Sequence, residues 1–290
     1  MSTIDTRELE QRCEALFALP NHQPMPEEAE ATIDLLLTAL ERGVVRAAAL
    51  DDRGEWAAVP WVKRGILAGF RVGRMVDQSV LGDARVSRPF TFFDKHTLPT
   101  RALTLDDGIR VVPGGSSIRR GAFVARGVVC MPPMFVNVGA YVGAGTMIDS
   151  HALIGSCAQV GERVHLSAAA QIGGVLEPVN ASPVVIEDDV VVGGNCGVYE
   201  GTVVRARAVL AAGVVLTRGT PVYDLVKECV IRAAPGGVLQ IPANAVVVPG
   251  ARHVSGAWGR EQGISLQTPV IVKYRDEKTD LATALEGWLR

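Results

Sequence analysis

A spacing of six residues runs through the middle of the chain and limits its fold more than any other feature. Aliphatic residues or cysteine recur at every sixth position from 118 to 172 and again from 186 to 216. These positions are Ile118, Val124, Cys130, Val136, Val142, Ile148, Ile154, Val160, Leu166, Ile172, Ile186, Val192, Val198, Val204, Leu210 and Leu216. Ordinary strands have a period of two and α-helices a period of 3.6, so neither explains this pattern. A repeat this short buries its apolar residue only by stacking on its neighbours, which predicts a solenoid.

A second column of mostly compact residues lies two positions before these. Its members are Ala122, Val128, Met134, Ala140, Thr146, Ala152, Ala158, Val164, Ala170, Val190, Cys196, Thr202, Ala208 and Val214. One large and one small inward residue in every six is typical of a hexapeptide-repeat β-helix, in which three flat faces close a triangular coil of about 18 residues. The sequence therefore predicts a mainly β fold, a left-handed parallel β-helix of about five coils.

The repeat divides the chain into three predicted parts. Residues 1–109 lack it and are expected to form a helical α/β domain. Residues 110–220 are expected to form the left-handed β-helix, and residues 221–290 a small β-rich C-terminal cap that ends in a helix. This cap is expected to cover the open end of the solenoid.

Shorter patterns refine the first part. Helical spacing of apolar residues predicts helices over 6–17, 27–42 and 61–70, the last of them opened by a proline. Residues 45–59 are expected to form a hairpin.

The register of the repeat breaks once, where the spacing from Ile172 to Ile186 is 14 rather than six. Residues 173–185 contain two glycines and two prolines, so we expect them to leave the coil as a loop. Loops on a rigid scaffold commonly build binding sites.

Composition argues against several classes of protein. The formal net charge is −2 and the pI about 6.2, so no basic field attracts nucleic acid or an anionic membrane. Apolar runs fall short of the roughly 18 residues that span a bilayer, and the first residues lack a signal-peptide pattern. Five cysteines without paired spacing suggest reduced thiols, with Cys130 and Cys196 as core filler. We expect a cytoplasmic protein.

Residues just after the inward columns point away from the core and are candidates for chemistry. Asp149 follows Ile148, and Ser167 should lie directly beside Asp149, one coil later. Glu200 is also off the inward column, and Arg110 comes just ahead of the first coil. Two carboxylates, a hydroxyl and an arginine outside the core of a rigid scaffold could form a site, although each alone also fits a solvated surface residue.

Two histidines in the repeat raise the question of a metal. Zinc enzymes built on hexapeptide solenoids need three histidine ligands, and the repeat contains only His151 and His165. We therefore predict no metal site. His165 could act as a general base, but a single histidine in a repeat also suits a structural role.

Several strings together resemble a known family. They are RVVPGGSSIRRGAFVARGVV, MPPMFVNVGAYVGAGTMIDSHALIGSCAQVGERVHLSAAAQIGGVLEP and EDDVVVGGNCGVYEGTVV. They closely resemble the tetrahydrodipicolinate N-succinyltransferases of lysine and diaminopimelate biosynthesis. RPFTFFDKH, VVVPG and PVIVK extend the likeness to nearly the whole chain.

The resemblance implies an N-acyltransferase that is a homotrimer with active sites between neighbouring subunits. It implies no permanently bound cofactor, with succinyl-CoA as co-substrate and small molecules as the other partners. The succinyl group would pass to the amino group of a cyclic imine dicarboxylate, which opens to a 2-amino-6-keto acid, and CoA would leave as a thiolate.

The same resemblance assigns roles to single residues. Asp149 in GTMID and Glu200 in YEG match catalytic positions, and Asp149 would also contact substrate. Arg110 in RVVP would hold a substrate carboxylate, which suits a planar bidentate donor. A carboxylate can accept the proton that an attacking amine must lose. The remaining implied contacts are Ser167 for substrate and Ala169, Gly173 and Gly174 for CoA.

The chain departs from the family's usual sequence in four places. His151 stands where a tryptophan is common, the MPPMFVN string is one residue longer than usual, and two further segments differ. The glycine pair that commonly follows HLS is replaced at 168–169 by two alanines, and the run at 193–197, GGNCG, lacks the usual arginine. These changes leave the choice between succinyl and acetyl donors open. An acetyl-CoA-using or natural-product-branch paralogue acting on a similar amino dicarboxylate is the main alternative. A non-catalytic solenoid assembly subunit is the alternative from another class.

Overall fold

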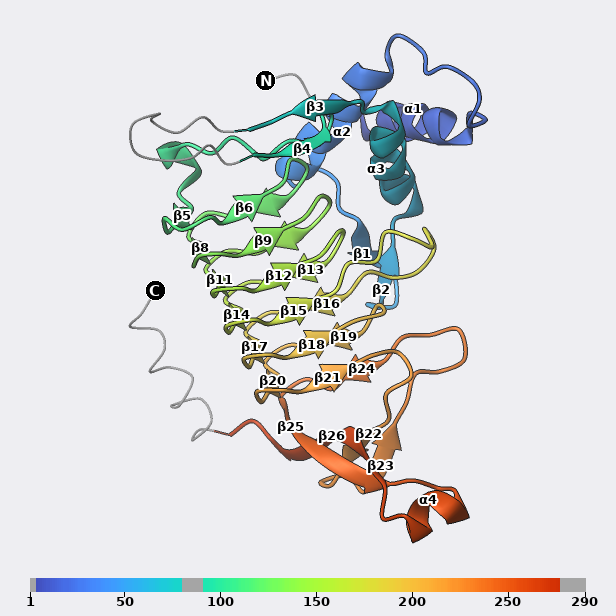
Figure 1. Cartoon of the computed structure of the whole chain (residues 1–290), viewed down its shortest axis with the longest axis vertical. Coiled ribbons are helices and arrows are strands. Elements are labelled where there is room, and N and C mark those ends of the chain that lie inside the picture. The colour runs from blue at the N-terminus through green and yellow to red at the C-terminus, as the bar shows by residue number, and fades with distance from the viewer. Residues whose placement is uncertain (1–3, 80–90, 277–290) are drawn as a thin grey trace.

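The computed structural model describes residues 4–79 and 91–276, and its centre is a solenoid built from short parallel strands (Figure 1). The strands form three sheets, one for each face of the coil. The first face contains β6 (Ser117–Ile118), β9 (Phe135–Val136), β12 (Leu153–Ile154), β15 (Gln171–Ile172), β18 (Gly197–Val198) and β21 (Val215–Leu216). The second contains β7 (Phe123–Val124), β10 (Tyr141–Val142), β13 (Gln159–Val160), β16 (Val185–Ile186), β19 (Val203–Val204) and β24 (Gln240–Ile241). The third contains β5 (Arg110–Val111), β8 (Val129–Cys130), β11 (Met147–Ile148), β14 (His165–Leu166), β17 (Val191–Val192), β20 (Val209–Leu210) and the start of β25 (Ala245–His253).

The inward columns predicted from the sequence form the core of this solenoid. Ile148 pairs with Cys130 on one side and Leu166 on the other, so equivalent residues stack along the axis. All three are fully buried. Each coil therefore stacks its buried residues on those of the coils before and after it, as a short repeat requires. The predicted hexapeptide-repeat solenoid is confirmed.

Threonine fits the compact column because its hydroxyl finds partners inside the turn. Thr146 is fully buried, and its Oγ1 donates to the carbonyl oxygen of Gly161 at 2.9 Å and accepts from the amide of Val164 at 3.0 Å. A buried hydroxyl without such partners would cost folding free energy.

Three helices cover one side of the solenoid near its N-terminal end (Figure 1). The elements are α1 (Thr6–Ala18), α2 (Ala29–Glu41), β1 (Ala48–Leu50), β2 (Trp56–Ala58), α3 (Pro60–Val72), β3 (Met75–Asp77), β4 (Phe93–Lys95) and the 3₁₀ turn η1 (Leu105–Asp107). The predicted helices and the β1–β2 hairpin are present at nearly the expected bounds. The core of the helices includes Leu36 and Ile66 and reaches Val138 and Cys157 of the solenoid, so the two parts pack together.

After β21 the chain leaves the coil and then returns to it. The later elements are β22 (Val222–Asp224), β23 (Cys229–Ile231), β24, β25, α4 (Ala257–Glu261) and β26 (Ser265–Tyr274). Ile241 pairs with Val204 on the second face, and Val247 pairs with Leu210 on the third. The coil therefore continues beyond residue 220, where the sequence pattern placed the end of the β-helix, and a spacing of six returns between two fully buried residues.

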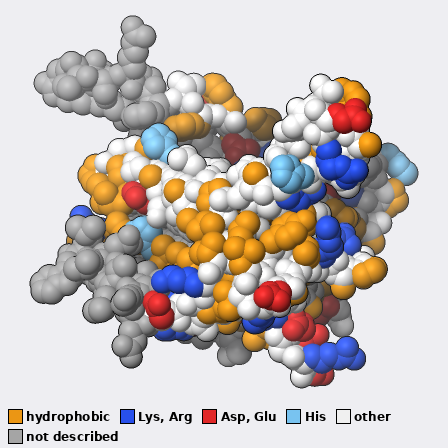
Figure 2. All heavy atoms as spheres, turned by 90° about the horizontal axis from the view of Figure 1, so that it is seen from below, with side chains coloured by type: hydrophobic (Ala, Val, Ile, Leu, Met, Phe, Trp, Pro, Cys, Tyr) orange, Lys and Arg blue, Asp and Glu red, His pale blue; other side chains and the backbone are white. Residues whose placement is uncertain are grey.

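The remaining strands cover the C-terminal end of the solenoid. β25 and β26 pair antiparallel along their length, and β26 also pairs with β22. Figure 2 views the molecule from this end and shows hydrophobic side chains gathered across the middle of the face. Exposed hydrophobic residues of this part include Leu225, Val226 and Leu266. The helix expected at the end of this cap, over residues 280–290, lies outside the described residues.

None of the helices in the described part of the chain has the length and apolar character needed to cross a membrane.

Candidate functional site

The candidate residues lie at two different corners of the triangular coil. Asp149 and Ser167 directly follow β11 and β14, which places them in neighbouring coils at the corner between the third and first faces, here called the Asp149 corner. Gly173 and Glu200 follow β15 and β18 and lie at the corner between the first and second faces, here called the Glu200 corner. Arg110 lies on β5 of the third face.

The backbone at the Asp149 corner is held by hydrogen bonds between coils. The amide of Asp149 donates to the carbonyl oxygen of Leu166 at 2.9 Å, and its Oδ1 accepts from the amide of Ser150 at 2.7 Å. The predicted position of Ser167, one coil after Asp149, is confirmed by the pairing of β11 with β14. Both side chains are partly exposed, so a ligand can reach them.

Ala169 completes this corner in a left-handed conformation with φ 59°. Its amide donates to the carbonyl oxygen of Ser150 at 2.8 Å. In the next coil the amide of Asn195 donates to the carbonyl oxygen of Ala168 at 3.0 Å. Segments 168–169 and 193–197, whose sequences differ from those usual in the family, are therefore stacked on each other beside Asp149.

Glu200 lies at the tip of its corner, exposed and also left-handed, with φ 54°. Its Oε2 accepts a hydrogen bond from the amide of Arg218 in the following turn at 3.1 Å. This contact orients the carboxylate along the edge of the solenoid. The carboxylate is therefore available to a ligand that approaches this edge.

The glycine pair at the Glu200 corner is required by packing. A Cβ on Gly173 would lie 2.7 Å from Cδ1 of Tyr199, and a Cβ on Gly174 would lie 2.5 Å from the amide nitrogen of Ser156. Both distances are shorter than side chains tolerate. Glycine here lets neighbouring turns approach closely, whether or not CoA also contacts this backbone.

Arg110 and Asp149 are associated with the same face. β5 pairs with β8 and β8 pairs with β11, so the strand of Arg110 is separated from the end of β11 by two strand spacings, about 10 Å. Arg110 is exposed, with its backbone amide bound to the carbonyl oxygen of Val128 at 3.0 Å. A guanidinium on a long side chain and a carboxylate at this separation can bind an anionic group and a hydrogen-bond-donating group, respectively, of one small ligand.

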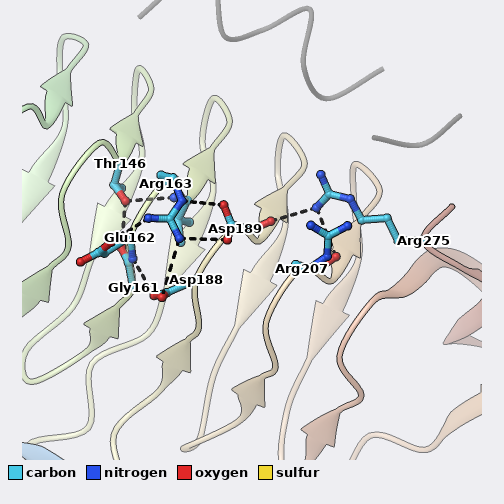
Figure 3. A network of polar contacts seen from close by, with 9 residues as sticks. Thr146, Gly161, Glu162, Arg163, Asp188, Asp189, Arg207 and Arg275 are labelled. Carbon is cyan, nitrogen blue, oxygen red and sulfur yellow. Dashed lines mark hydrogen bonds and ion pairs between the residues drawn. The ribbon is translucent and has the colours of Figure 1, made fainter. Parts of the chain in front are cut away.

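The corner between the second and third faces carries a row of charged residues that the sequence analysis did not identify (Figure 3). This row, here called the charged ladder, consists of Arg163, Asp189, Arg207 and Arg275. Arg163 donates to both carboxylate oxygens of Asp189, at 2.8 and 3.0 Å, and these hydrogen bonds hold the pKa of Asp189 below its ordinary value. Arg275 of the C-terminal segment donates to the carbonyl oxygen of Asp189 at 3.0 Å, and Arg207 donates to Asn244 at 2.9 Å. Charged residues recurring at one turn position were the available signal. The ladder attaches the C-terminal segment to the coil.

The N-terminal hairpin is docked on the second face through a cationic side chain. The guanidinium of Arg46 lies 3.6 Å from the ring centroid of Tyr141 and donates to Gln159 at 2.9 Å. Trp56 donates to Glu187 at 2.9 Å, and a cavity of about 330 Å³ lies beside these residues. Burial lowers the pKa of Arg46. Cation–π stacking and the two hydrogen bonds fix the hairpin to the coil despite this cost.

Residues 4–79 and 91–276 contain no group of three His, Cys, Asp or Glu arranged to hold a metal ion.

Comparison with known proteins decides the family. The chain is 39% identical over 269 residues to a 2,3,4,5-tetrahydropyridine-2,6-dicarboxylate N-succinyltransferase of Paramagnetospirillum magneticum, which covers 91% of this chain and 90% of that protein. The chain belongs to the tetrahydrodipicolinate N-succinyltransferase family. A relative with the same name from Chelativorans sp. is 36% identical over 301 residues and covers both chains completely. The family resemblance expected from the sequence strings is confirmed.

Two family models agree with this family, and a solved structure agrees with the fold. Residues 8–72 match the model described as "Tetrahydrodipicolinate N-succinyltransferase N-terminal", and residues 183–218 match "Hexapeptide repeat of succinyl-transferase". A crystal structure of a putative 2,3,4,5-tetrahydropyridine-2-carboxylate N-succinyltransferase from Campylobacter jejuni aligns with TM-score 0.50 and 18% identity. The alignment covers 86% of this chain and 63% of that one, and it supports the fold.

Proposed function

We propose that this protein is a CoA-dependent N-acyltransferase that moves a succinyl group from succinyl-CoA to the amino group of tetrahydrodipicolinate, in lysine and diaminopimelate biosynthesis. The observation that carries the proposal is its relationship to N-succinyltransferases, at 39% identity over 91% of the chain. Asp149, Glu200 and Arg110 are all found on the outer surface of the solenoid, where substrates have access.

The reaction needs a neutral amine, a bound acceptor and an exit for one proton. In the proposed step water first adds across the C=N bond of the cyclic imine, which turns the ring nitrogen into a neutral secondary amine. This nitrogen attacks the thioester carbonyl, a C–N bond forms, the C–S bond breaks, and CoA leaves as a thiolate, after which the hydrated ring opens to the keto acid. Asp149 binds the acceptor next to its amino group, and Glu200 acts as the acid/base that exchanges the proton. Arg110 holds an acceptor carboxylate in a bidentate contact, and Ser167 adds a hydroxyl contact.

The burial of cysteines in the solenoid supports direct transfer of the acyl group from CoA to the acceptor, without an acyl-enzyme intermediate. Cys130 and Cys157 are fully buried, and burial raises the pKa of each thiol to about 12. A thiol must be ionised and accessible to act as a nucleophile. Neither of these cysteines meets that condition.

We further propose a homotrimer in which the Asp149 corner of one subunit faces the Glu200 corner of its neighbour. Support comes from the placement of the two corners on opposite edges of the first face. A head-to-tail contact repeated three times closes into a ring with three equivalent sites. CoA would then contact Gly173 and Gly174 on one subunit and Ala169 on the other.

Succinyl-CoA is proposed as a co-substrate, with no cofactor held permanently. We propose a cytoplasmic location, which suits both the unpaired cysteines and the acyl-CoA donor.

A specific observation favours keeping acetyl-CoA as a second candidate donor. Two of the segments that differ from the family, 168–169 and 193–197, are stacked on each other at the Asp149 corner, and the second lacks an arginine. An arginine lost beside a site can remove a partner for the free carboxylate of a succinyl chain.

The test is thiol release from succinyl-CoA and acetyl-CoA, measured side by side with tetrahydrodipicolinate or its stable mimic 2-aminopimelate. The proposal predicts a strong preference for succinyl-CoA. A preference for acetyl-CoA would show that the altered corner has changed the donor, and no release with either donor would reject acyl transfer.

A further inference from the structure

Lys63 is completely buried although its side chain ends in an ammonium group. It lies on α3 in the N-terminal part, and its Nζ donates a hydrogen bond to the carbonyl oxygen of Ala181. Burial lowers the pKa of Lys63, which reflects the free-energy cost of removing a charge from water. Ala181 belongs to the loop 173–185, which leaves the coil. The buried ammonium of Lys63 therefore links the N-terminal part to this loop.

The far end of this loop lies directly against the Glu200 corner. A Cβ on Gly201 would lie 2.6 Å from the carbonyl oxygen of Ser182, the residue after Ala181. Gly201 follows Glu200 in the chain and has φ 72°. The turn that presents the Glu200 carboxylate is therefore packed against the residue next to the carbonyl that Lys63 holds.

The near end of the loop is fixed to the same corner and to the helices. The amide of Val175 donates at 3.2 Å to the carbonyl oxygen of Ser156, which lies at the same corner two coils before Glu200. Leu176 packs against the helical core that contains Ile66, one turn after Lys63 on α3. The loop thus lies between α3 and the Glu200 corner. The Lys63 ammonium anchors the C-terminal half of the loop, which contains Ala181.

We propose that Lys63 is a positioning residue for acyl transfer, which holds the loop 173–185 against the Glu200 corner. This proposal rests on the proposed function, because the corner that the loop supports carries Glu200 and the glycine pair expected to contact CoA. Lys63 does not touch reacting atoms. It keeps the backbone of the loop in the arrangement in which acyl-CoA is bound beside Glu200.

The test compares Lys63→Met with wild type and with Ile66→Val, a packing control on the same helix. Methionine keeps an unbranched chain but removes the ammonium. We expect amide hydrogen exchange over residues 174–184 to become at least about tenfold faster, because a segment that loses its anchor opens more often. We expect kcat/KM for succinyl-CoA to fall about 10- to 100-fold, with the KM for the acceptor within about twofold of wild type.

Thermal stability separates positioning from a general structural role. Removing a buried charge should leave Tm unchanged or raise it, whereas Ile66→Val should lower Tm and leave loop exchange and the kinetic parameters near wild type. A Lys63→Met enzyme whose succinyl-CoA kinetics match wild type would overturn the proposal, whatever its loop exchange. A loss of activity that only follows a fall in Tm would also overturn it. Failure of the proposed function is distinguishable, because it would appear as an inactive wild type, and loop exchange would then decide whether Lys63 anchors the loop.

Discussion

Asp149 and Glu200 lie at opposite edges of the first face of one solenoid, two coils apart. Asp149 precedes β12 and Glu200 follows β18, with β15 between these two strands. The two coils amount to about 10 Å along the axis, and the residues of one face add up to about 20 Å of chain. A single chain therefore does not bring both carboxylates to one reacting nitrogen. If both act in the same reaction, two subunits must supply them.

Replacing Arg110 with lysine should weaken binding of the acceptor. Lysine keeps the positive charge but lacks the planar fork that pairs with a carboxylate. We expect the KM for tetrahydrodipicolinate to rise about 10- to 100-fold while the KM for succinyl-CoA stays within about twofold. Steady-state kinetics with each substrate varied in turn provides the measurement. A change in the succinyl-CoA KM alone would move Arg110 to the donor side of the site.

Asp189→Asn should make the unfolding free energy of the protein depend less on pH in the acidic range. The hydrogen bonds from Arg163 keep the pKa of Asp189 below its ordinary value, so the pair stabilises the fold above pH 4 and loses this contribution as the pH falls further. Both side chains are partly exposed, so we expect the variant to lose only about 0.5–1 kcal/mol of unfolding free energy at pH 7.

Urea unfolding at pH 7 and pH 3 tests this prediction, because the difference from wild type should shrink at the lower pH. Asp188→Asn is the matched control, since Asp188 lies 4.0 Å from Arg163 and is more exposed. A difference for Asp189→Asn that is the same at both pH values would mean that the charge of Asp189 is not its cause.

The sequence predicted the solenoid well because one rule acts on every coil. Each inward residue must meet its equivalents at a spacing of about 18, so residues such as Ile148 and Leu166 reveal their neighbours directly. The rule failed where a longer segment was inserted. Ile241 and Val247 rejoin the coil after β22 and β23, and nothing in the local sequence shows where an excursion returns.

Replacing Ala169 with glycine should stabilise the protein slightly. A non-glycine residue in the left-handed region costs about 1–2 kcal/mol, and glycine costs about 0.5–1 kcal/mol of chain entropy, so we expect a net gain of about 0.5 kcal/mol. Ala168→Gly is the control, because the positive φ belongs to Ala169 and glycine at 168 should only destabilise. Urea unfolding of both variants measures the difference. Equal effects at the two positions would contradict this account of the corner.

The sequence offers candidate site residues but not their arrangement in space. Asp149, Glu200 and Arg110 were identified from motif strings, and their position after or before an inward residue correctly predicted that they are outside the core. The corner at which each residue lies can also be worked out from the sequence, because every third inward residue belongs to the same face. Lys63 could not be predicted, since its contact with Ala181 joins segments far apart in the chain and depends on how α3 docks on the solenoid.

The most direct test of the shared site is a mixing experiment with two inactive variants, Asp149→Asn and Glu200→Gln. Asparagine can still accept the hydrogen bond from the amide of Ser150, so the fold should survive. Each variant alone should lose about 10²- to 10⁴-fold in turnover. When the two are unfolded together and reassembled in equal amounts, a site between subunits finds both intact carboxylates about a quarter of the time. We therefore predict recovery of about a quarter of the wild-type rate of CoA release. A mixture as inactive as the separate variants would show that both carboxylates are not supplied across a subunit interface.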